Sequence, residues 1–132
     1  MKLRGFNPNF KVDYVSQFHR YVEDNEVWND YLLINDLPIT TLGNLKEIKG
    51  NLWLSNNKTL KSLYKLEKIK RYLSLNNSDL NDLGELKNIG LDIYLCNSKL
   101  DNIGKLEHVG GDWINDTKNL KSLYDKRINT LR

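Results

Sequence analysis

The side chains best suited to covalent chemistry in this sequence are one cysteine and two histidines. Cys96 with His19 or His108 would supply a thiolate nucleophile and the base that activates it. His19 lies beside Phe18 in a segment with helical spacing, and the other two fall at different points of a repeating pattern, so no nucleophile–base pair is indicated. No phosphate loop stands between a strand and a helix, and no metal-ligand spacing occurs. The sequence therefore predicts no enzyme, no metal and no cofactor.

Noncovalent recognition has stronger candidates, which are aromatic and basic side chains. Trp and Tyr are frequent in binding hot spots because they bury a large area at little entropic cost. The candidates for a binding surface are Tyr31, Leu33, Trp53, Tyr72, Tyr94 and either Ile114 or Trp113. The candidates for phosphate contacts are Lys65, Lys68, Lys70 and Arg71. A charge run of this kind is more often a solvated face than a site.

A repeat of 20 or 21 residues must position these side chains. From Leu60, apolar residues recur three apart and end in a Leu-x-Leu pair, and the next cycles begin at Leu80 and Leu100. The same frame extends backward through a 21-residue cycle to Trp28. Residues 28–124 are therefore predicted to form about five coils.

Each coil contains two apolar patterns. The Leu-x-Leu pair has period two, which is typical of a short strand with one buried face. The segment of period three favours tight turns or a short 3₁₀-like stretch over a long α-helix. Turns rich in Asn, Ser and Asp follow each strand, and glycines recur at two corners. The chain has 23 Leu and 18 Asn but no Ala, which disfavours a helical bundle.

The pattern Ile-x-Gly-x-Leu-x-Leu, followed by a turn and Leu-x-x-Leu-x-x-Leu, resembles a leucine-rich-repeat array, and in particular the coils of receptor L domains. The resemblance covers roughly residues 28–124 and implies a ladder of stacked parallel strands. It implies no specific function, because such arrays bind many unrelated partners. The asparagine expected after the strand is present at Asn57 but is Ser78 and Ser98 in the next coils. This departure and the short convex segment favour a tight, nearly straight coil.

The open ends of the solenoid need covers. Residues 1–27 are expected to form an N-terminal cap, with an amphipathic helix over residues 11–26. Its apolar and aromatic residues at helical spacing are Tyr14, Val15, Phe18, Tyr21 and Val22. A role of this helix in partner binding stays open. Residues 125–132 are expected to form a polar C-terminal cap with Ile128 and Leu131 turned back. The predicted fold is thus a repeat solenoid, mainly β, with a helical N-terminal cap.

Side chains that alternate with the inward leucines are expected on one sheet face about 20 Å across, since strands lie just under ~5 Å apart. Near Trp113, either that residue faces inward and Ile114 outward, or a one-residue slip reverses them. We expect this face to bind another protein, although exposed aromatics can also simply pack with one another on strands. The alternative is RNA or single-stranded nucleic acid, with Trp53, Tyr72 and Tyr94 stacking on bases and nearby lysines on phosphates.

A second ladder is expected on the convex side, where opposite charges become neighbours. Its members are Lys46, Glu67, Lys87 and Glu107. They are expected to form solvated ion pairs, each of little energetic value.

Composition and net charge limit the partners and the cell compartment that are expected for this chain. A net charge of +3 on 132 residues is a weak argument for nucleic acid or membrane binding. No apolar run reaches a membrane span, no signal sequence is indicated, and a single cysteine suits the reducing cytoplasm. The chain is expected to act without turnover, by stoichiometric occupancy of a partner. Its small size and its wealth of Lys, Asn, Ile and Leu resemble phage proteins that inhibit host defence nucleases or ribonucleoproteins, such as anti-CRISPR proteins.

Overall fold

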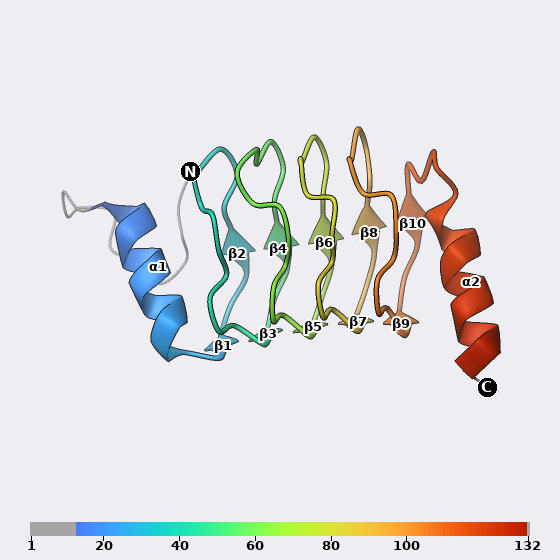
Figure 1. The fold of residues 1–132 in the computed structure, drawn as a ribbon, viewed down its shortest axis with the longest axis horizontal. Coiled ribbons are helices and arrows are strands. Elements are labelled where there is room, and N and C mark those ends of the chain that lie inside the picture. Colours follow the sequence, from blue (N-terminus) through green and yellow to red (C-terminus); the bar gives the residue numbers. More distant parts are fainter. Residues whose placement is uncertain (1–12, 132) are drawn as a thin grey trace.

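Two short strands form in every coil, and they stack into two parallel sheets (Figure 1). The computed structural model describes residues 13–131. The first sheet has the order β1-β3-β5-β7-β9 and the second the order β10-β8-β6-β4-β2. The strands of the first sheet are Val27–Trp28, Glu47–Ile48, Lys68–Ile69, Asn88–Ile89 and His108–Val109, in chain order. Those of the second are Leu32–Leu33 (β2), Leu52–Trp53 (β4), Leu73–Ser74 (β6), Ile93–Tyr94 (β8) and Trp113–Ile114 (β10).

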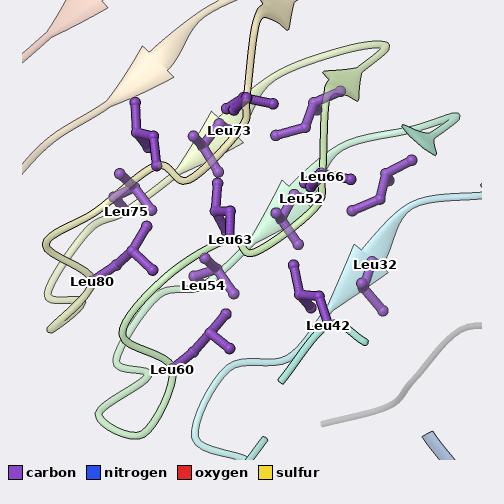
Figure 2. Close-up of a cluster of buried hydrophobic side chains, with 14 of the residues drawn as sticks. Leu32, Leu42, Leu52, Leu54, Leu60, Leu63, Leu66, Leu73, Leu75 and Leu80 are labelled. Atoms are coloured by element: carbon purple, nitrogen blue, oxygen red, sulfur yellow. The ribbon is translucent and has the colours of Figure 1, made fainter. Parts of the chain in front are cut away.

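The second sheet confirms the predicted repeat frame. Leu32 pairs with Leu52, Leu52 with Leu73, and Leu73 with Ile93, so each residue lies over its equivalent one coil away. The structure is a parallel β-solenoid, as the pattern predicted. The side chains of these rows fill the interior, and Figure 2 shows leucines of successive coils stacked on one another.

The first sheet was not predicted from the sequence. Each of its strands has two residues and a single inward side chain, so no alternation is visible in the sequence. The segment of period three lies just before each strand and forms the expected tight turn. In successive coils the amides of Leu45, Leu66 and Leu86 donate to the carbonyl three residues earlier, at 3.1 to 3.2 Å.

Asn57 accommodates the extra residue of the 21-residue coil. Its side chain is fully buried, and its Nδ2 donates to the carbonyls of Ile34 and Leu37 in the preceding coil. Its Oδ1 accepts from the amides of Thr59 and Leu60. In the next coil the turn is one residue shorter, and the Oγ of Ser78 accepts a single amide, that of Leu80. Asn thus stands in the longer turn, and Ser stands in the two shorter turns that follow.

The helix α1, Tyr14–Asp24, covers the first rung. Asp13 caps it by accepting from the amides of Val15 and Ser16. Phe18 and Val22 are fully buried, and the ring of Phe18 lies 5.6 Å from that of Trp28. This arrangement agrees with the amphipathic pattern. The part of the expected cap in residues 1–12 lies outside the described residues.

The helix α2, Leu120–Leu131, covers the other end and differs from the expected polar segment. It begins inside the last predicted coil because Asp116 accepts from the amides of Leu120 and Lys121. Leu131 is 54% exposed, so its expected return to the core is wrong. The edge of the last rung is closed by side chains of α2. Tyr124 Oη accepts from the amide of Val109, and Arg127 Nε donates to the carbonyl of Leu106.

The prediction that the charged residues on the convex side pair with one another is wrong. Lys46, Glu67 and Lys87 do lie one rung apart, with backbone bonds of 2.8 and 2.9 Å between successive members. Among the described side chains, however, Lys46 pairs with Glu26 at 3.6 Å, and no ion pair joins the four predicted residues to one another. Neither described helix is long and apolar enough to cross a membrane.

Loss of one leucine from the stack should be costly. Leu75→Ala removes a fully buried side chain in the middle of the solenoid and is expected to lower the free energy of unfolding by about 2–5 kcal/mol. Leu91→Ala is the matched control, because Leu91 is 38% exposed and should cost little. Urea unfolding measures both, and equal stability of the two variants would contradict the register.

Two glycines with the same backbone conformation should separate torsional strain from steric clash. Gly84 and Gly104 have φ of +59° and +54°. A Cβ on Gly104 would meet nothing closer than 3.6 Å, whereas one on Gly84 would lie 2.5 Å from the carbonyl oxygen of Tyr64. Gly104→Ala is expected to cost about 1–2 kcal/mol from the left-handed conformation alone. Gly84→Ala should cost about 1 kcal/mol or more beyond that, measured by urea unfolding.

Candidate functional site

The outer face of the second sheet gathers most of the predicted binding residues. Pairing of β2, β4, β6, β8 and β10 places one residue of each strand in a single outward row. This row consists of Leu33, Trp53, Ser74, Tyr94 and Ile114. Trp113 pairs with Ile93 in the inward row, so the first of the two predicted registers is correct. The Trp113 ring packs on Tyr124 of α2, with ring centroids 5.4 Å apart.

Four aromatic side chains on this face form a continuous cluster. Tyr31 and Tyr72 precede their strands by one residue, and each contacts Trp53, with ring centroids 6.1 and 5.7 Å apart. Tyr72 and Tyr94 continue the series edge to face at 5.4 Å. All four remain partly exposed. We call these residues the aromatic cluster. Its rings support one another and still present area to solvent.

A small residue in the outward row creates a shallow depression. Ser74 stands between Trp53 and Tyr94, is 4% exposed, and shares a hydrogen bond of 3.2 Å with Ser55 through their hydroxyl oxygens. The depression has a volume of about 480 Å³. Its lining residues are Leu33, Asn35, Trp53, Ser55, Tyr72, Ser74, Asn76 and Tyr94.

The polar lining residues Asn35, Ser55 and Asn76 were not predicted from the sequence. The signal was their position two residues after the outward row, which places them on the same face. Asn76 is already engaged, since its Oδ1 accepts from the amide of Cys96 at 2.8 Å. The Oδ1 of Asn35 is buried and has no hydrogen-bond partner among the described residues. This amide oxygen is enclosed by the protein beside the depression.

The two tyrosines at the depression remain neutral well into the alkaline range. Burial raises the pKa of Tyr94, and the nearby Asp92 carboxylate raises it further. The Tyr94 hydroxyl lies 3.4 Å from Asp92 Oδ2. Burial also raises the pKa of Tyr72, and a hydrogen bond from Trp53 acts in the opposite direction. At neutral pH both phenols are therefore uncharged.

The predicted phosphate contacts are not gathered at the aromatic cluster. Lys68 lies on β5 of the first sheet, in the same row as Glu47. Lys65 precedes that strand, and its Nζ donates to Asn44 Oδ1 at 2.7 Å. Lys70 and Arg71 are exposed at the corner between the sheets, and only Arg71 directly precedes a member of the cluster, Tyr72. The lysines and the aromatic rings thus face different surroundings.

The three candidates for covalent chemistry lie on different elements. His19 is on α1 and accepts from the amide of Thr40 through Nε2. His108 is on β9 of the first sheet, and Cys96 follows β8 of the second. Within residues 13–131, no hydrogen bond joins any two of them, and no group of three or more His, Cys, Asp or Glu side chains is placed to hold a metal ion.

Comparisons with protein-family models, curated proteins and solved structures find no match to this chain.

Removing the charge of Asp92 should lower the pKa of Tyr94. In Asp92→Asn the like-charge effect disappears, but burial persists, so the pKa should move toward its ordinary value without reaching it. Because the folded-state pKa is raised, stability falls as pH rises above about 10, and the fall should be smaller in the variant. Titration of ¹³C-labelled tyrosine rings by NMR measures the pKa of Tyr94 in both proteins. Asp101→Asn, on an exposed turn, is the control, and an unchanged Tyr94 titration in Asp92→Asn would contradict the assignment.

Proposed function

We propose that this protein is a non-enzymatic binding module that covers a surface of a partner protein with the outer face of its second sheet. The observation that carries the proposal is the aromatic cluster, whose four rings stay partly exposed beside a shallow depression. Each ring keeps part of its area accessible, and contiguous apolar area on one face is a feature of interaction sites. Trp and Tyr are also the residues that most often dominate protein interfaces.

The rigidity of the scaffold supports a binding role. Backbone hydrogen bonds of 2.9 and 3.0 Å join Leu52 to Tyr72 and Leu54 to Ser74, so a regular ladder holds the strands beneath the face. A preformed face loses little conformational entropy on association. In this proposal the coils are of the leucine-rich-repeat type, like those of receptor L domains. The single leucine frame and the parallel ladder support that assignment.

Occupancy of a partner would act as inhibition wherever the covered surface is one that the partner uses. A phage-type inhibitor of a host defence nuclease, comparable to an anti-CRISPR protein, is the form that the size and composition of the chain favour. Its effect would rise in proportion to the amount bound and would stop at a fixed stoichiometry. Loss of function in the partner would be reversed when the two proteins dissociate.

A crosslinking experiment tests the proposed face. A photoreactive amino acid at Leu33, beside the depression, should trap the partner in the native host, and the same amino acid at Lys68 on the first sheet should not. The trapped protein, produced separately, is then titrated with the unmodified chain. Saturation at a fixed ratio without turnover is expected. Modification or cleavage of excess partner by a trace amount would contradict the proposal.

Substitutions in the aromatic cluster should weaken that complex. Trp53→Ala and Tyr94→Ala are each expected to cost about 2 kcal/mol of binding free energy, as hot-spot residues do. Tyr64→Ala is the control, since Tyr64 is a 40% exposed tyrosine outside this face. Calorimetric titration measures affinity, and urea unfolding confirms that each variant folds. Unchanged affinity in both cluster variants would contradict the assignment of the aromatic cluster to the interface.

A further inference from the structure

We propose that the outer face of the second sheet receives a positively charged, arginine-bearing segment of the partner, with a guanidinium group seated against the aromatic cluster beside Asp92 and Asp112. This inference rests on the proposed function and specifies the chemistry of what is bound. It is carried by the charge of one edge of the face and by the ring surfaces beside that edge.

Two neighbouring carboxylates give this face an acidic edge. Asp92 and Asp112 each precede their strand by one residue, in the row that also contains Tyr31 and Tyr72. They lie on adjacent rungs, whose backbones are about 5 Å apart. In the part of the chain that the structure describes, neither forms an ion pair. Like charges on adjacent strands are unfavourable, and a bound cation would remove that repulsion.

The Asp92 carboxylate is held in place before any partner binds. Its Oδ1 accepts from the amide of Asp112 at 2.8 Å, and its Oδ2 lies 3.4 Å from the hydroxyl of Tyr94. Gly111 lets the carboxylate approach, because a Cβ at that position would lie 2.1 Å from Oδ1. A carboxylate fixed in this way binds a cation with little further loss of side-chain entropy.

The rings next to this carboxylate are suited to a planar cation. Tyr72 occupies the rung beside Asp92 in the same row, and its ring contacts both Trp53 and Tyr94. Faces of Trp and Tyr attract cations, and a guanidinium stacks flat on them while its edge donates hydrogen bonds. An arginine can therefore contact a ring and a carboxylate at once.

The donor pattern of a guanidinium suits this acidic edge. A guanidinium offers five N–H donors and no acceptor, which complements the two carboxylates. A phosphate offers only acceptors and would be repelled by Asp92 and Asp112. The chemistry of this face thus favours a basic protein segment over nucleic acid.

The positive charge of the chain lies mainly elsewhere. Lys65 and Lys68 belong to the side of the first sheet, next to acids such as Glu47 and Glu85. Arg71 is the cation closest in sequence to the aromatic cluster, and no ion pair joins it to Asp92. The acidic edge therefore remains available to a cation from outside.

Short peptides and the whole folded chain test the inference. The probe is acetyl-Gly-Arg-Gly-Arg-Gly-amide, and its control has citrulline in place of arginine, which keeps the shape and removes the charge. Binding is followed through the indole N–H resonance of Trp53. The arginine peptide should bind about tenfold more tightly than the citrulline peptide, and added salt should reduce that difference.

Variants that lack carboxylate charges show which residues cause the preference for the arginine peptide. The double variant Asp92→Asn/Asp112→Asn should lose most of the preference for arginine, while the Asn side chain keeps the acceptor that the amide of residue 112 uses. The matched control is Glu67→Gln/Glu107→Gln, which removes two exposed charges preceding β5 and β9 of the first sheet and should keep the preference. Backbone amide spectra show whether each variant is folded.

The outcomes separate this inference from the proposed function. Equal binding of the arginine and citrulline peptides, or no response of Trp53 to either, would overturn the charge preference, whereas the crosslinking at Leu33 decides the proposed function independently. Retention of the arginine preference in the Asp92/Asp112 variant would also overturn the inference. A response of Trp53 to oligothymidylate and none to the arginine peptide would likewise overturn it.

Discussion

The structure depends on one constraint, which is that parallel backbone hydrogen bonds place every residue over its equivalent one coil away. Leu52 therefore lies between Leu32 and Leu73, and Trp53 lies between Leu33 and Ser74. The same register that stacks the leucines also assembles the outer face. One strand register therefore determines both the inward row of the core and the outward row of the candidate site. A slip of one residue would turn the inward side chains outward and the outward side chains inward. The aromatic cluster needs no dedicated element to position it, because residues about 20 positions apart are made neighbours by the coil.

A ladder of this kind has weak points at its ends and at any change of coil length, and polar side chains stabilise those points. The buried amide of Asn57 bonds the backbone of two coils where one coil is a residue longer. Tyr124 and Arg127 bond the backbone groups that the last rung would leave open. Unpaired strand edges invite association with other chains, so these contacts also limit stacking of one solenoid on another.

The repeat frame could be predicted because each inward leucine recurs with the period of the coil, and the outward row followed by alternation. Other features could not. A two-residue strand such as Asn88–Ile89 shows no alternation, and α2 was hidden because Leu120 fits both the coil frame and a helix capped by Asp116. The depression arises where Ser74 stands between two large rings, and the volume left by a small residue depends on its neighbours in space. Asp92 and Asp112 hold the same position of the repeat, so their adjacency follows from the frame, whereas the hydrogen bond from the amide of residue 112 to Asp92 depends on side-chain geometry.

Contacts of each coil are mainly with the coil before and the coil after it, while α1 and α2 lie at opposite ends of the stack (Figure 1). This arrangement has a mechanical consequence. A force applied between the two ends acts along the direction of the rung-to-rung hydrogen bonds. Because the rungs are in series, every interface carries the full force, and the weakest interface separates first. A detached coil of 20 residues would release about 70 Å of extended chain while the remaining rungs kept their stacking. The solenoid is thus built to yield in steps, with the resistance of each step set by the leucines of a single rung.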